Sequence, residues 1–262
     1  MIRIGTTLVV AAAALSLAPS AEAMAPAEKP TIILVHGAFA DSSSWDPVAT
    51  RLLGDGYNVI AAAVPLRSIK SDAEYVSSIV AAQPGKVVLV GHSYGGAVIS
   101  AATAPAGKIK SLVYVAGYAL DSGESGGTMG DRFPEGTLGQ ALAPPVPLAD
   151  GSKDLYILPA KFWAQFAADV AKAKAANMAV TQRPVTAAAL AEPAVTAGWR
   201  TVPSWFIYGS LDKNIPRSAH AFMASRAKAR ETIEVKGSSH VVMLSHPAEV
   251  AAMIERAARA PD

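Results

Sequence analysis

The sequence predicts an α/β fold in which helices flank a parallel, doubly wound sheet of about six strands. Short runs of hydrophobic, often β-branched residues recur along the chain, and amphipathic helical patterns separate most of them. In addition, 51% of the 262 residues are hydrophobic and only 17% are charged. This composition suits one large buried core and excludes a disordered chain.

The hydrophobic runs are continuous rather than alternating, as expected for strands that are buried on both faces of a sheet. They lie at residues 31–35, 58–64, 86–90, 111–116, 204–208 and 232–235. Helical patterns lie at residues 42–53, 71–82, 94–103, 218–229 and 248–258. Because a helix follows most of the strands, we expect parallel strands joined by right-handed crossovers.

A long insertion interrupts this alternation between the fourth and fifth strands, over about residues 120–200. Its first part is rich in glycine and proline, which predicts loop, and its second part is rich in alanine and helical in pattern. A connection of this length with helices of its own is expected to form a lid over the sheet. Residues 24–262 are therefore predicted to form a single domain with a small helical lid.

Residues 1–23 have the pattern of a signal peptide that is removed on export. One base, Arg3, precedes an apolar run, and the segment ends in small residues at Ala21 and Ala23. A membrane anchor is the alternative, but the apolar run is shorter than the roughly 20 residues that span a bilayer. We expect a mature chain that starts near Met24, is periplasmic or secreted, and has no stable membrane insertion.

Charge and cysteine content exclude several classes of protein. A formal net charge of +2 provides no basic field for a nucleic-acid backbone. The absence of cysteine excludes disulfides, thiolate nucleophiles and cysteine-ligated metal sites. No metal or cofactor is expected, and the expected partner is a small-molecule substrate.

The strongest functional motif is the G-x-S-x-G pattern at residues 91–95, between a predicted strand and a predicted helix. There Ser93 lies on a tight turn, whose glycines allow the strand and the helix to approach closely. Ser93 is predicted to be a nucleophile, with the backbone N–H of Tyr94 as one donor of an oxyanion hole. The second donor is expected in the loop after the first strand. It is the N–H of Ala38, or that of Phe39 if the loop is turned by one residue.

A serine nucleophile needs a histidine base and an orienting acid, and both should follow it in the chain. His240 lies in the loop after the last strand and is the predicted base, whereas His220 and His246 are expected to have capping or surface roles. Asp212, in the loop after the fifth strand, is the predicted acid. Asp121, one strand earlier, is the alternative.

Together these motifs resemble the α/β-hydrolase superfamily over the whole mature chain. The resemblance rests on His36-Gly37, GHSYGG at residues 91–96, G-x-x-D-x-x-x-P at residues 209–216, and His240. Residues 36–45 (HGAFADSSSW) and the small lid resemble bacterial esterases that are distantly similar to plant methylesterases and hydroxynitrile lyases. The resemblance implies that Ser93, Asp212 and His240 form a catalytic triad that cleaves carboxylic esters through an acyl-enzyme, without a cofactor.

Departures from the superfamily narrow the expected chemistry. Hydroxynitrile lyases of this fold have a lysine after the catalytic histidine and a threonine in the oxyanion loop, where this chain has Val241 and Gly37. A lyase or acyltransferase with the same triad is the alternative function, as is a non-catalytic small-molecule-binding protein of this fold. The residues expected to contact substrate are aromatic: Phe39, and in the lid Phe133, Phe162, Trp163 and Phe166.

Overall fold

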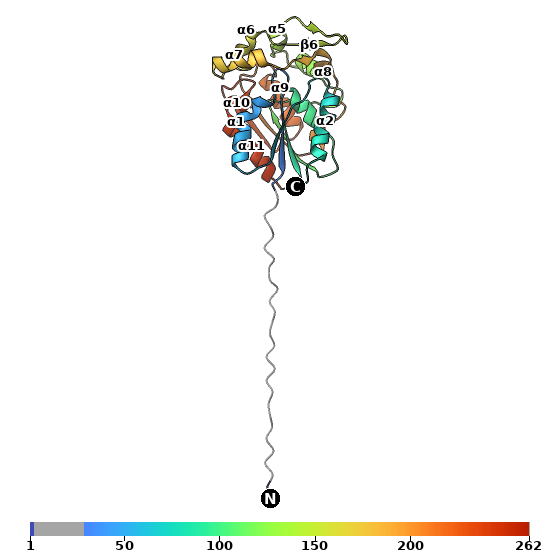
Figure 1. Cartoon of the computed structure of the whole chain (residues 1–262), viewed down its shortest axis with the longest axis vertical. Helices are drawn as coiled ribbons and strands as arrows, with labels where there is room; N and C mark the ends of the chain where they lie inside the picture. Colours follow the sequence, from blue (N-terminus) through green and yellow to red (C-terminus); the bar gives the residue numbers. More distant parts are fainter. Residues whose placement is uncertain (3–28, 262) are drawn as a thin grey trace.

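A six-stranded sheet forms the centre of the protein in a computed structural model that describes residues 1–2 and 29–261 (Figure 1). The strand order is β2-β1-β3-β4-β8-β9, and every neighbouring pair is parallel. The strands are β1 (Thr31–Val35), β2 (Val59–Ala62), β3 (Val87–His92), β4 (Ile109–Val115), β8 (Ser204–Gly209) and β9 (Glu231–Val235). The predicted fold class and its six parallel strands are confirmed.

Burial explains why the strands read as continuous hydrophobic runs. β1 and β3 lie in the interior of the sheet, and all of their residues are buried because helices cover both faces. β2 and β9 lie at the two edges and keep partly exposed residues. The loops that follow β1 and β3 therefore start from fully buried strands.

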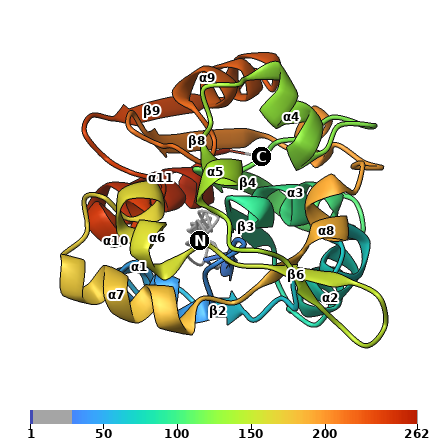
Figure 2. The ribbon, with the colours of Figure 1, turned by 90° about the horizontal axis from the view of Figure 1, so that it is seen from above.

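Helices cover both faces of the sheet (Figure 2). α1 (Asp46–Gly54) contacts α11 (Pro247–Arg259) on one face, and α2 (Ile69–Ala81) contacts α3 (Tyr94–Ala101) on the other. α9 (Arg217–Arg226) packs on β8. Three short elements complete the domain: the 3-10 helices η1 (Ser42–Trp45) and η2 (Gly198–Arg200), and α10 (Val242–Ser245). The helix expected at 42–53 is divided, because Pro47 lies in the first turn of α1, which begins after η1.

The insertion, defined here as the chain between β4 and β8, lies over one end of the sheet (Figure 1). Its helices are α4 (Gly126–Arg132), α5 (Leu138–Ala141), α6 (Pro159–Phe166), α7 (Lys172–Thr181) and α8 (Ala187–Ala191). Three antiparallel strands pair beside them: β5 (Val146–Pro147), β6 (Lys153–Leu155) and β7 (Val185–Thr186). The glycine-rich first part is not all loop, because a capping box of Ser125 and Thr128 starts α4.

The predicted signal peptide falls almost wholly on residues 3–28, which lie outside the described part of the chain. Within the described part, we find no helix with both the length and the apolar character needed to cross a bilayer. The described residues also contain no group of three or more His, Cys, Asp or Glu side chains that could hold a metal ion.

Candidate active site

Ser93 lies on a strained turn between β3 and α3. Its backbone φ is 52° and its ψ is −123°, a conformation that is costly for a residue with a Cβ. The turn is compact: a Cβ atom on Gly95 would lie 2.5 Å from the carbonyl oxygen of Val35. The carbonyl of Ser93 accepts a hydrogen bond from the N–H of Tyr118 at 3.0 Å. These contacts hold the turn in place, and Ser93 lines a cavity beneath the insertion.

Two backbone N–H groups beside this turn are free to stabilise an oxyanion. Within the described chain, the N–H groups of Ala38 and Tyr94 donate to no other group. The loop of Ala38 comes close to Ser93, since a Cβ on Gly37 would lie 2.6 Å from the Cβ of Ser93. The alternative donor, the N–H of Phe39, is already bonded to a carbonyl oxygen at 3.0 Å. The geometry therefore favours Ala38 over Phe39 as the second donor.

Asp212 and His240 form a buried hydrogen-bonded pair. Oδ2 of Asp212 lies 2.7 Å from Nδ1 of His240, and Oδ1 accepts from the N–H groups of Asn214 at 2.8 Å and Ile215 at 3.0 Å. Burial alone would raise the pKa of Asp212, but the charge of His240 and hydrogen bonds from two histidines hold this pKa well below its usual value. The carboxylate is therefore ionised at neutral pH. It requires a proton on Nδ1 of His240 and leaves Nε2 as the basic nitrogen.

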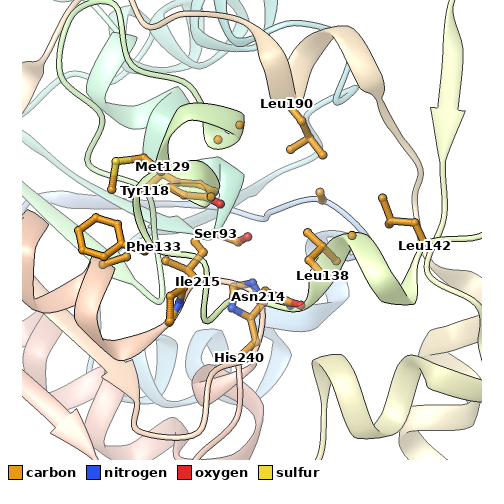
Figure 3. A pocket seen from close by; sticks show the side chains of 18 of the residues that line it. Ser93, Tyr118, Met129, Phe133, Leu138, Leu142, Leu190, Asn214, Ile215 and His240 are labelled. Carbon is orange, nitrogen blue, oxygen red and sulfur yellow. The ribbon is translucent and has the colours of Figure 1, made fainter.

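The basic nitrogen of His240 and the hydroxyl of Ser93 face the same cavity. Nε2 of His240 is buried and has no hydrogen-bond partner among the residues described. Both side chains line the cavity (Figure 3). Hydrogen bonds between a nucleophile and its base often tighten only when substrate is bound. A molecule bound in this cavity would therefore meet both the Ser93 hydroxyl and the unpaired nitrogen of His240.

Asp121, the alternative acid, contacts Arg200 rather than His240. Its carboxylate accepts two hydrogen bonds from the guanidinium of Arg200, one of them from Nε at 3.0 Å. Hydrogen bonding to Arg200 lowers the pKa of Asp121. Of the two carboxylates that the sequence proposes as the acid, the structure brings Asp212 to His240.

His220 lies at the candidate site, where the sequence does not place it, and the expected capping or surface role is wrong. Its side chain is 0% exposed, and its Nε2 lies 3.1 Å from Oδ2 of Asp212. Its ring stacks on Tyr208, with 4.7 Å between the ring centroids. A signal for this placement exists in the sequence: Ala219, His220, Met223 and Ala224 recur at helical spacing and form the buried face of α9.

The cavity at Ser93 and His240 has a volume of about 310 Å³, the size of a small-molecule pocket. Its walls are mainly apolar, and Asp131 is the only acidic residue among the described lining residues, which include no lysine or arginine. The side chains around it include Tyr118, Met129, Phe133, Leu138, Leu142 and Leu190 (Figure 3). Such a cavity suits a small, largely apolar molecule without a negative charge.

The aromatic residues expected to contact substrate divide into two groups. Phe39, Phe133 and Phe166 line the cavity. Phe162 is fully buried behind Phe166, with 5.0 Å between the ring centroids, and does not line it. Trp163 is 36% exposed on the outer side of α6, where its indole N–H donates to a backbone carbonyl at 3.0 Å. Helical spacing alone does not separate a side chain that lines a cavity from one that packs behind it.

The loop that carries His240 is hydrogen-bonded to the insertion. The hydroxyl of Ser239 donates to the carboxylate of Asp169 and lies 3.3 Å from the carbonyl oxygen of Phe166. The ring of Phe166 also makes an edge contact with the His240 ring, at 5.1 Å between centroids. The position of His240 therefore depends on contacts from the insertion as well as on β9.

The order in which this sheet presents serine, aspartate and histidine is that of an α/β hydrolase. The chain belongs to the Alpha/beta hydrolase family, since the model of that family matches residues 32–253. This membership supports hydrolase activity.

Three known proteins illustrate the similarity. The Alpha/beta hydrolase nvfD of Aspergillus novofumigatus is 27% identical over 253 residues, which cover 88% of this chain and 97% of that protein. Putative methylesterase 19 of Arabidopsis thaliana is 24% identical over 263 residues, which cover 87% and 96%. The crystal structure of polyneuridine aldehyde esterase superposes with a TM-score of 0.75 over 87% of this chain and 98% of that one. At 19% identity, this last likeness shows the fold alone.

Proposed function

We propose that the protein is a serine esterase that cleaves small, uncharged carboxylic esters through an acyl-enzyme. The observation that carries this proposal is the buried Asp212–His240 hydrogen bond beside a cavity that Ser93 also lines. Family membership supports a hydrolase, and two of the similar proteins are named as a putative methylesterase and an esterase. The cavity, which is apolar and has no basic lining residue in the described chain, supports a neutral substrate.

In the proposed first half-reaction, the Oγ atom of Ser93 attacks the ester carbonyl carbon while Nε2 of His240 takes the hydroxyl proton. Asp212 accepts from Nδ1–H, orients the imidazole and stabilises its positive charge. The oxyanion accepts hydrogen bonds from the N–H groups of Ala38 and Tyr94. The tetrahedral intermediate then collapses and expels the alcohol, which leaves with the proton from His240.

In the second half-reaction, a water molecule attacks the carbonyl carbon of acyl-Ser93, and His240 takes a proton from that water. Collapse of the second tetrahedral intermediate releases the carboxylic acid and returns the proton to Ser93. The two half-reactions use one base, one acid and one pair of donors, so no cofactor is needed.

A specific observation favours hydrolysis over the lyase alternative. The position after His240, where similar lyases have a lysine, is occupied by Val241, which is fully buried. The described residues that line the cavity include no lysine. An acyltransferase would use the same residues, so only its product distinguishes it from an esterase.

A panel of neutral esters with graded acyl length tests the proposed function. We expect hydrolysis of at least the shorter members to the free acid, because the cavity of about 310 Å³ limits the size of the acyl group. The same reactions with an added alcohol separate hydrolysis from transfer. A new ester as the main product would identify an acyltransferase, and a folded protein that cleaves no member of the panel would contradict the proposal.

We also propose that the protein is exported, on the strength of the apolar run and the small-residue site that ends at Ala23. Intact-mass measurement of protein from the periplasm or medium of an expressing bacterium is expected to show a chain that starts at or beside Met24. An uncleaved chain recovered from membranes would instead support the anchor.

A further inference from the structure

The proposed acid contacts a second histidine that the reaction described above does not use. Oδ2 of Asp212 lies 2.7 Å from Nδ1 of His240 and 3.1 Å from Nε2 of His220. Oδ1 accepts from two backbone N–H groups, so both oxygens of this buried carboxylate have two donors each. A carboxylate has about four lone-pair sites, and all of them are used here.

The chemistry of this contact determines which nitrogen of His220 carries the proton. An ionised carboxylate only accepts hydrogen bonds, so Nε2 of His220 must be the donor. Its other ring nitrogen, Nδ1, is buried and has no hydrogen-bond partner within the described chain. Burial lowers the pKa of His220, although the hydrogen bond and the charge of Asp212 oppose this effect. His220 is therefore a neutral donor near pH 7.

The packing around His220 holds its ring in one orientation. The ring lies nearly parallel to that of Tyr208, with an interplanar angle of 15°. α9 supplies the backbone, and β8 supplies Tyr208 from the sheet. The N–H of His220 is thus held toward Asp212 by rigid elements rather than by a loop.

We propose that His220 is a positioning residue, whose Nε2–H holds the Asp212 carboxylate in the orientation that keeps His240 in its Nδ1–H form. Without His220, the carboxylate would lose one of its four donors and could turn, and His240 would no longer be held in a single tautomer. The catalytic part of this inference rests on the proposed esterase function, whereas the hydrogen-bond arrangement does not.

The other titratable groups that face this cluster do not account for such an effect. Tyr208 and Tyr118 are buried, and burial raises the pKa of each. His92 of β3 is also buried, and burial lowers its pKa well below the usual value. Each of these groups is therefore neutral near pH 7, which leaves Asp212 as the fixed charge that both His220 and His240 contact.

Two substitutions separate the hydrogen bond from the packing. His220→Phe keeps an aromatic ring against Tyr208 and removes the donor. His220→Gln keeps an N–H donor near the place of Nε2. His246→Gln is the matched control, because His246 is a partly exposed histidine that also contacts a carboxylate, at 3.2 Å from Glu249.

The first readout is NMR of the mature protein with ¹⁵N-labelled histidine, which needs no substrate. We expect the neutral Nε2–H form for His220 and the Nδ1–H form for His240 in the wild type. In His220→Phe we expect the Nε2–H form of His240 to appear beside the Nδ1–H form, whereas His220→Gln and His246→Gln should keep the Nδ1–H form alone. A melting curve for each variant checks that it is folded.

The second readout is ester hydrolysis across pH. In His220→Phe we expect kcat to fall roughly tenfold or more. This is the rate factor that corresponds to the loss of one hydrogen bond to a charged group. KM should change less than kcat, because His220 does not line the cavity. His220→Gln should recover most of the rate, which a loss of packing alone would not produce.

The outcomes of these experiments separate the positioning role of His220 from the esterase function. A proton on Nδ1 of His220, an unchanged His240 tautomer in folded His220→Phe, or equal rates for His220→Phe and His220→Gln would overturn the role of His220. If His220→Phe does not fold, the wild-type tautomers and the rate of His220→Gln still decide. If the NMR results agree but the wild type cleaves no ester, the esterase proposal fails and the His220–Asp212 arrangement stands.

Discussion

Ser93→Ala is expected to abolish ester turnover and covalent labelling while the protein keeps its fold. No other atom in the proposed mechanism can form the acyl-enzyme, so the loss in kcat should be on the order of 10⁶-fold, as for a serine protease of another fold. The substitution should cost little stability, because alanine keeps the Cβ atom and therefore the same strain at φ 52°.

A fluorophosphonate probe measures this expectation directly. Wild-type protein should gain one label, and Ser93→Ala should gain none. Ser78→Ala is the matched control, since Ser78 is an exposed serine in α2 and its loss should leave labelling and turnover unchanged. A label on a serine other than Ser93, or full turnover by Ser93→Ala, would show that the nucleophile lies elsewhere.

Asp212→Asn is expected to lower kcat by a factor on the order of 10⁴, the size known for the same change in a serine protease. The two backbone N–H groups at Oδ1 need an acceptor, so the amide oxygen of asparagine should stay there. Its NH₂ group then takes the place of Oδ2 and faces Nδ1 of His240 as a donor. His240 must accept at Nδ1 and carry its proton on Nε2, which removes the base that Ser93 needs.

Asp121→Asn makes the same chemical change in the other candidate and serves as the control. Asp121 contacts Arg200 rather than His240, so kcat should stay near the wild-type value. Melting temperatures should show that both variants are folded at neutral pH. If Asp121→Asn abolishes turnover while Asp212→Asn keeps most of it, the assignment of the acid is wrong.

The pH dependence of stability gives a second check on Asp212. Its pKa is held below the usual value in the folded protein, so its ionised form stabilises the fold at neutral pH. This contribution is lost as the pH falls through the folded-state pKa. The difference in stability between wild type and Asp212→Asn should therefore shrink below about pH 4, the ordinary range for an aspartate.

The sequence was sufficient for the fold class because buried parallel strands leave continuous hydrophobic runs, and the structure confirms six such strands. It was also sufficient to name residues that meet at one cavity, because the loops after parallel strands converge at one end of the sheet. Ser93 and His240 line that cavity, and Asp212 contacts His240. Their catalytic roles stay predictions.

The sequence was not sufficient where a contact depends on how two elements pack. The contact between His220 and Asp212 joins a helix face to a loop eight residues earlier, and its geometry depends on how α9 lies against β8. Phe162 and Phe166 are one helical turn apart, yet only Phe166 lines the cavity. Such differences arise from tertiary packing, on which a local pattern carries no information.

The hydrogen bond between Ser239 and Asp169 restricts which sequences the insertion can adopt during evolution. Surface insertions tolerate exchange better than the strands they connect, which makes them a usual route to new substrate ranges. A replacement insertion that lacks a carboxylate at position 169 would remove one of the two acceptors of the Ser239 hydroxyl. Only the backbone carbonyl at position 166, 3.3 Å away in this structure, would be left. The loop of the neighbouring His240 would lose that anchor. If the insertion of a relative is grafted onto this domain, residues 166–169 of this chain should therefore be retained.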